Sequence, residues 1–189
     1  MSLKKGILDR YECSDDGRII IDASVRSVEE LYSNFERDAP YLKRDLDQEF
    51  VDWLTDSAAE LGPHDFTIRI SLPACPDPAV MDRVRNSIRT FYEYLRQLEL
   101  DALRTMLRRS IILFVIGLVL LALAIRLAQH FADSPGVTPQ VFVQGLTVAA
   151  WVSLWEAIAN IFLEWRPHQK KINLCARIRN APVIFRATS

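Results

Sequence analysis

The chain has 189 residues, of which 25% are charged and 50% are hydrophobic, and its formal net charge is −1. This length suffices for one small domain together with membrane-spanning segments. Residues 1–100 carry 13 Lys and Arg against 20 Asp and Glu, whereas residues 101–189 carry 10 against 4. Because the basic residues of the second half flank apolar runs, membrane flanking is a simpler explanation than nucleic-acid binding, and we expect no nucleic-acid partner.

The cysteine pattern favours a reducing compartment. Cys13, Cys75 and Cys175 stand far apart and form no C-x-x-C pair, which argues against a disulfide scaffold. All three lie close to predicted strands and could meet at one sheet edge as a metal site. Three separate thiols are the simpler interpretation, and we expect no metal. The N-terminal residues lack the apolar region of a signal peptide.

The first elements indicate an α/β domain. Residues 18–25 (RIIIDASV) predict a strand that is covered on both faces. Ser27 and Glu30 have the spacing of a capping box, in which the serine hydroxyl accepts from a helix amide and the glutamate reaches back. The helix that they start should be short, because Asp38-Ala-Pro40 interrupts it.

A second helix is predicted over residues 46–61. Asp45-Leu-Asp-Gln48 offers a cap of the same type, and Gly62-Pro63 supplies a left-handed stop followed by a residue that cannot continue the helix. The helix should bury a single apolar stripe of Phe50, Leu54, Ala58 and Leu61.

Residues 66–72 (FTIRISL) show the clearest strand pattern in the chain. Apolar and polar side chains alternate strictly, so one face should be buried and the other wet. The wet face would carry Thr67, Arg69 and Ser71.

A long helix should follow from Pro78, at the first helical position after Asp77. It carries a stripe at heptad spacing: Val84, Ile88, Phe91, Leu95, Leu98 and Ala102. The stripe either packs on the domain's own sheet, which is the simpler interpretation, or forms a seam between protomers. No helix breaker precedes the apolar run at Ile111, so we expect one helix over about 79–131, ~80 Å long.

Two segments have the length and composition of membrane spans. The run IILFVIGLVLLALAI at 111–125 covers only ~22 Å of a ~30 Å hydrocarbon core, and its flanks extend it to a first span over 110–132. A second span is predicted over 141–165, with an external loop at 133–140. Two buried core helices are the soluble alternative, but the rest of the chain is too small to cover them.

The flanking charges predict the topology. The loop at 133–140 has no Lys or Arg, so both termini should lie in the cytoplasm. We expect the membrane to be the cell membrane of a bacterium or an archaeon. The basic inner flanks are Arg104, Arg108, Arg109, Arg166, Lys170 and Lys171.

The second span carries a stripe of small and polar residues: Gly145, Ala149, Ser153, Glu156, Asn160 and Glu164. Counted from Trp165, Glu156 should lie ~13 Å above the inner boundary, near mid-membrane, where a carboxylate costs about 3 kcal/mol. The first span has no polar side chain between Ser110 and Arg126. The stripe is therefore expected to face a symmetry mate, another subunit or water. A polar contact that locks an oligomer is the plainer role, and an ion or proton path is the alternative.

The last residues should return to the domain. Pro167 is expected to kink or restart the helix, Ile172, Leu174 and Ile178 suggest an amphipathic continuation, and Asn180-Ala-Pro182 should stop it. Residues 183–186 then predict a strand. The expected fold is a transmembrane two-helix hairpin that follows a cytoplasmic α/β domain of about three strands (1–109), with residues 166–189 forming a cytoplasmic helix and a strand that returns to the sheet.

No motif for catalysis or cofactor binding is visible: there is no Gly-rich phosphate loop, no H-E-x-x-H and no G-x-S-x-G. We expect no catalytic residue, no cofactor and no enzyme activity. The sequence favours a membrane scaffold, signalling or interaction subunit that oligomerises through the second span, with the bilayer, copies of itself or another membrane subunit, and a cytoplasmic protein as partners. A small oligomeric pore is the alternative.

Overall fold

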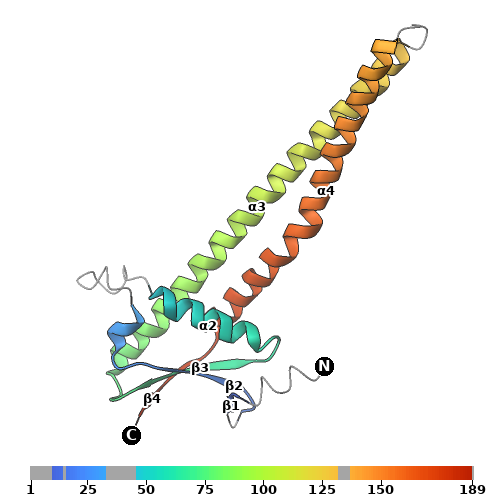
Figure 1. Ribbon diagram of the computed structural model, residues 1–189. Coiled ribbons are helices and arrows are strands. Elements are labelled where there is room, and N and C mark those ends of the chain that lie inside the picture. The colour runs from blue at the N-terminus through green and yellow to red at the C-terminus, as the bar shows by residue number, and fades with distance from the viewer. Residues whose placement is uncertain (1–9, 15, 33–45, 132–136, 189) are drawn as a thin grey trace. The chain divides into compact units, whose positions relative to one another are not determined.

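The computed structural model describes residues 10–14, 16–32, 46–131 and 137–188 (Figure 1). The chain divides into two compact units. Residues 1–97 and 171–189 form the first, which we call the sheet unit, and residues 98–170 form the second, which we call the hairpin unit. Two long helices, α3 (Pro78–His130) and α4 (Val137–Asn180), each contribute residues to both units.

The sheet unit contains a small mixed sheet in the order β1-β2-β3-β4. Its strands are β1 (Glu12–Cys13), β2 (Ile19–Ser24), β3 (Phe66–Leu72) and β4 (Val183–Ala187). The pairs β2–β3 and β3–β4 are parallel and β1–β2 is antiparallel. The predicted return of the terminal strand to the sheet is thus confirmed. The short strand β1 was not predicted; it joins β2 through a turn in which Gly17 has φ +74° and its amide bonds the Ser14 carbonyl at 2.8 Å.

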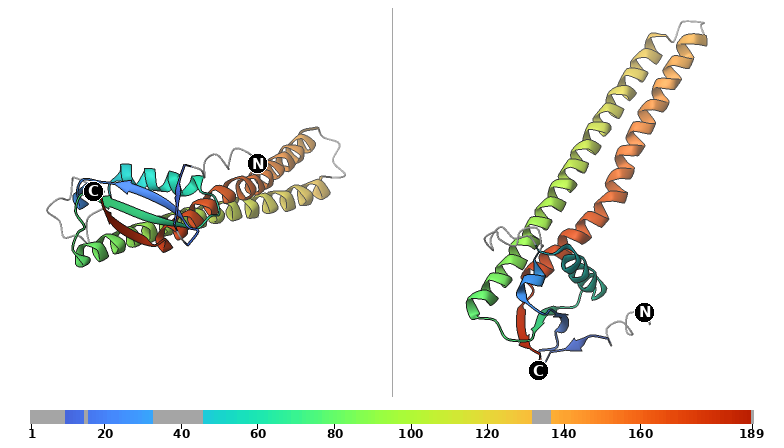
Figure 2. Two further views of the ribbon diagram at one scale, coloured as in Figure 1. Left: turned by 90° about the horizontal axis from the view of Figure 1, so that it is seen from below. Right: turned by 60° about the vertical axis from the view of Figure 1, so that its left-hand side comes forward.

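Helices cover one face of this sheet. In the sheet unit, α2 (Gln48–Glu60) and the segments of α3 and α4 lie on the same side of the strands (Figures 1 and 2). The core between the two layers is mainly apolar and includes Ile21, Leu31, Leu54, Ile68, Ile70, Ile88 and Ile178. Within the sheet unit the predicted heptad stripe begins on this core, because Val84 and Ile88 are buried in it.

The caps differ in detail from those predicted. Residues 28–31 form one turn of 3₁₀-helix (η1, Val28–Leu31), and the Ser27 side chain makes no capping hydrogen bond. Glu30 instead accepts from the Arg26 amide at 2.9 Å, so the predicted capping box is wrong. Helix α2 is capped by Asp47, which accepts from the amides of Glu49 and Phe50. The predicted cap residue Asp45 and the break at 38–40 lie outside the described residues.

The stop signals of α2 and α4 act as predicted. Gly62 has φ +60° directly after α2, and α4 ends at Asn180 before Pro182. Helix α4 starts at Val137, four residues before the predicted start of the second span at 141. The helix also continues through Pro167 without restarting.

The prediction of a wet face on β3 is wrong. All seven of its residues are buried, including Thr67, Arg69 and Ser71. β3 lies between β2 and β4, so side chains from both neighbours cover its polar face, although no helix among the described residues does. A central position in the sheet cannot be recognised from the alternation of one strand.

The two long helices are the parts of the described chain that could cross a membrane. Segments within Pro78–His130 and Gln140–Asn180 are long and apolar enough by length and composition. Many of their large apolar side chains are exposed, among them Trp155 at 73% and Leu163 at 74%.

Candidate functional site

Small residues bring α3 and α4 together in the hairpin unit. A Cβ atom added at Gly117 would lie 2.8 Å from Leu154 Cγ, so the glycine is required for this approach. Ala124 of α3 and Ala150 and Ala157 of α4 are also buried. Close helix contact through glycine and alanine is typical of membrane hairpins.

The predicted stripe on α4 is not this packed face. A Cβ atom added at Gly145 would meet no atom within 4 Å, and Ala149 is exposed. Ser153 is half-buried, and its hydroxyl donates to the Ala149 carbonyl at 2.9 Å. The Glu164 side chain lies outside the described residues.

The inner part of the stripe faces a cavity. Glu156 and Asn160 line a hollow of about 570 Å³ together with residues of α3, namely Ala102, Thr105, Met106, Arg109 and Ser110. We call this cavity the α3–α4 hollow. From the sequence, Glu156 was expected to meet no polar side chain of the first helix; the structure instead places a cation and two hydroxyl residues around the same cavity.

The antiparallel register of the two helices explains the difference. Gly117 lies against Leu154, and Glu99 bonds His168 Nδ1 at 2.8 Å. Counted from the Gly117–Leu154 contact, Glu156 is level with residue 115, ~7 Å along α3 from Ser110. Counting from Trp165 alone placed Glu156 ~13 Å from the inner boundary, which is farther than its ~7 Å from the level of Ser110. The level of Glu156 relative to α3 therefore depends on how the helices pair, which neither helix encodes alone.

Five of the six predicted basic flank residues belong to the hairpin unit, and Lys171 belongs to the sheet unit. Arg104 donates to Asp101 at 3.0 Å, an exposed pair. All six predicted cations are exposed: Arg104, Arg108, Arg109, Arg166, Lys170 and Lys171. Among them, only Arg109 lines the α3–α4 hollow.

In the sheet unit, the polar face of the sheet holds a charge network that the sequence did not predict. Arg69 Nη2 donates to Glu12 Oε2 and to Asp22 Oδ2, each at 2.7 Å, and Ser71 donates to Asp22 Oδ1 at 2.8 Å. The hydrogen bond from Arg69 lowers the pKa of Asp22, and the same bond raises the pKa of Arg69. These groups bond to one another across three strands, which indicates a structural network, although the buried Nε of Arg69 has no hydrogen-bond partner among the described residues.

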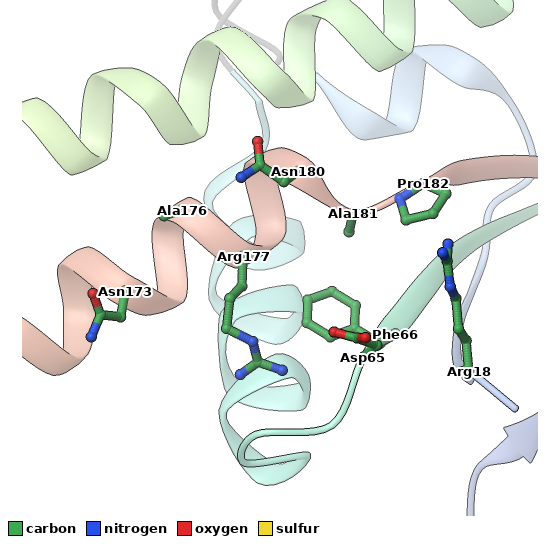
Figure 3. A pocket seen from close by; sticks show the side chains of 9 residues that line it. All are labelled: Arg18, Asp65, Phe66, Asn173, Ala176, Arg177, Asn180, Ala181 and Pro182. Atoms are coloured by element: carbon green, nitrogen blue, oxygen red, sulfur yellow. The ribbon is translucent and has the colours of Figure 1, made fainter.

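A second hollow, of about 580 Å³, lies where α4 meets the start of β3 (Figure 3). Arg177 points into it and lies over the Phe66 ring at 5.2 Å. Its guanidinium donates to the carbonyls of Gly62 and His64, which ties α4 to the loop after α2. The arginine is therefore engaged in holding the fold.

The cysteines do not gather. Cys13 and Cys75 are exposed and Cys175 is buried in the core. Within the described residues, no group of three or more His, Cys, Asp or Glu side chains is arranged to hold a metal ion.

No protein-family model matches the chain, and neither a curated protein nor a solved structure is significantly similar to it.

Proposed function

We propose that the protein is a non-enzymatic, two-pass membrane scaffold or signalling subunit that assembles with copies of itself through α4. The sheet unit is then an interaction module on the cytoplasmic side. Each part of this proposal rests on a separate feature of the two units.

Membrane insertion is supported by the apolar surface of the hairpin unit. Trp155, Phe162 and Leu163 are each at least 73% exposed in the single chain. Apolar patches of this extent in water mark a membrane or protein interface. The absence of Lys and Arg from residues 133–140, set against the cations at the other end, favours a bilayer with the sheet unit on its inner side.

Self-assembly is supported by one observation above the others: α4 carries a small face that its own protomer leaves unused. Gly145 and Ala149 are four residues apart, which is the spacing of small residues that lets two helix backbones approach in lipid. The contact between α3 and α4 within one protomer uses a different glycine, Gly117. The Gly145 face is therefore open to a helix from a second copy.

The two glycines give a matched test. Gly145→Val should abolish the oligomer, measured by mass photometry in nanodiscs, and leave the thermal midpoint of the detergent-solubilised protomer unchanged. Gly117→Val should lower that midpoint, because its side chain overlaps Leu154. An oligomer that survives both Gly145→Val and Ala149→Val, or a monomeric wild-type protein, would contradict the proposal.

A second candidate, a small oligomeric pore, is favoured by the polar lining of the α3–α4 hollow. Glu156→Gln keeps the size of the side chain and removes its charge. If this substitution abolishes an ion or proton flux into liposomes while the oligomer persists, the pore replaces the scaffold. Wild-type liposomes without flux at any tested voltage or pH would favour the scaffold.

A further inference from the structure

We propose that the α3–α4 hollow binds the headgroup of a phospholipid that carries a primary amine, with Arg109 holding the phosphate and Glu156 the ammonium. The inference rests on the membrane location proposed above, and it assigns a ligand to a cavity that self-assembly through Gly145 does not use.

The charges of the hollow match a zwitterion. Arg109 and Glu156 line the same cavity from different helices, and neither is in an ion pair with another residue that the structure describes. Each is an uncompensated charge next to an apolar run, which is unfavourable inside a bilayer. A ligand with a phosphate at one end and an ammonium at the other supplies a partner for both and leaves the site neutral.

The uncharged residues of the lining can both donate and accept hydrogen bonds. The Asn160 side chain makes no hydrogen bond to any part of the chain that the structure describes, so its carbonyl can accept from the ammonium and its amide can donate to a phosphate oxygen. Ser110 is buried, and its hydroxyl donates only to the Met106 sulfur at 3.9 Å, a weak acceptor, in the described structure. Its oxygen can accept in turn.

The surroundings favour a lipid over a free solute. Apolar, exposed side chains follow the lining residues Ser110 and Asn160 in sequence, namely Ile111 and Ile112 on α3 and Phe162 and Leu163 on α4. Acyl chains would lie against them while the headgroup enters the cavity. The volume of about 570 Å³ falls in the usual range of ~300–1,000 Å³ for small-ligand sites.

Glu156 needs N–H donors, and this favours a headgroup with a primary amine. A carboxylate such as Glu156 accepts N–H bonds from a primary ammonium, whereas the trimethylammonium of a choline headgroup has no N–H to donate. A glycerol headgroup has no cation, so its phosphate would satisfy Arg109, and its hydroxyls could donate to Glu156 but would leave the charge of Glu156 uncompensated. Phosphatidylethanolamine should therefore bind more tightly than phosphatidylcholine or phosphatidylglycerol with the same acyl chains.

Native mass spectrometry of the full chain, released from detergent with each of the three lipids, tests this. We expect phosphatidylethanolamine adducts to be retained about tenfold better than either other lipid. Glu156→Gln should remove that preference, whereas Arg109→Gln should weaken the retention of all three lipids, because they share the phosphate that Arg109 holds. Arg108→Gln is the matched control, because Arg108 is an exposed neighbour outside the hollow and its loss should leave the preference intact.

Several results would overturn the inference. Equal retention of the three lipids, or a preference that survives Glu156→Gln, would show that the hollow does not read the headgroup. Competition by free phosphoethanolamine at low concentration would point to a soluble zwitterion. If no lipid is preferred and the charge swap Arg109→Glu with Glu156→Arg restores a thermal midpoint that each single change lowers, the two residues pair directly.

A separate experiment, extraction of membranes with alkaline carbonate, tests whether the chain is inserted in a membrane. Alkaline carbonate should leave the wild-type chain in the membrane pellet. Its release to the supernatant would reject the proposed function, whereas a pelleted protein without lipid preference rejects only the headgroup site.

Discussion

Arg69 is the residue whose surroundings differ most from its sequence context. A strand that alternates apolar and polar side chains normally leaves its polar face in water, yet Arg69 is 7% exposed. Two carboxylates, Glu12 on β1 and Asp22 on β2, make this burial tolerable, because each accepts from the guanidinium. The short strand β1 thus has a role beyond its two residues: it delivers the second carboxylate.

This network predicts a pH dependence. The pKa of Asp22 is lowered in the folded chain, first by the hydrogen bond from Arg69. Its carboxylate therefore stabilises the fold above the unfolded pKa of about 3.9, and this contribution is lost as the pH falls through the folded pKa. The Asp22 side chain is 40% exposed, so solvent screening keeps the effect small.

Asp22→Asn should lower the thermal midpoint of the detergent-solubilised chain by about 2–5 °C at pH 7, as expected for a partly exposed ion pair. The difference from wild type should shrink as the pH falls below about 3.9 and through the lowered pKa of folded Asp22, because both proteins then lack the charge. Asp82→Asn, which removes an exposed pair with Arg85, is the control and should change little. Curves that stay parallel at all pH values would contradict the assignment.

At the scale of elements, β4 completes the sheet and one side chain of α3 covers its outer edge. Arg85 Nε donates to the Val183 carbonyl at 3.0 Å, and its guanidinium lies over the Phe185 ring at 5.5 Å. An edge strand with open backbone groups invites pairing with other chains. Arg85 occupies one of these groups, which fits a sheet that ends at β4.

β4 offers a matched pair of substitutions. Phe185 packs against the core, whereas its neighbour Ile184 points to the other face and is 41% exposed. Phe185→Ala should lower the free energy of unfolding of the sheet unit by about 1–3 kcal/mol, and Ile184→Ala by less than about 1 kcal/mol.

Buried Cys175 can report this opening, since it belongs to the same core. With Cys13 and Cys75 changed to serine, thiol labelling of the full chain should be about tenfold faster in Phe185→Ala than in Ile184→Ala. Removal of residues 181–189 should accelerate it further. Equal labelling rates in the two variants would show that β4 does not hold the core closed.

The predictability of the elements follows how local their signals are. Periodicity and stops such as Gly62 and Pro182 are enough to recognise the long helices, the terminal strand and the strands at 19–24 and 66–72. β1 has two residues and no alternation, so it carries no such signal. The sequence predicted Asp45 as the cap residue of α2, whereas Asp47 caps it, a position that the spacing of polar residues alone does not reveal. The surroundings of Glu156 and Arg69 depend on the register between helices and the order of strands, which no single segment encodes.

For the whole molecule, the sheet restricts how the chain can cross a membrane. β3 precedes both long helices and β4 follows them, yet the two strands pair along Ile68–Val183 to Leu72–Ala187. Strands of one sheet lie on one side of a bilayer, because their edges cannot cross hydrocarbon. The number of crossings between them is therefore even, which supports a helical hairpin with both termini on the same side.

The flanking charges predict that this side is the cytoplasm, and native cysteines allow a test in intact cells. A cysteine introduced at position 134, between the two helices, should react with a membrane-impermeant maleimide from outside. Cys13 and Cys75 are exposed in the folded chain, so the fold itself does not protect them, and they should react only after the cells are permeabilised. Cys175 is buried and its protection carries no information on topology. If Cys13 or Cys75 is labelled in sealed cells, or position 134 is labelled only after permeabilisation, the cytoplasmic placement of the sheet unit is wrong.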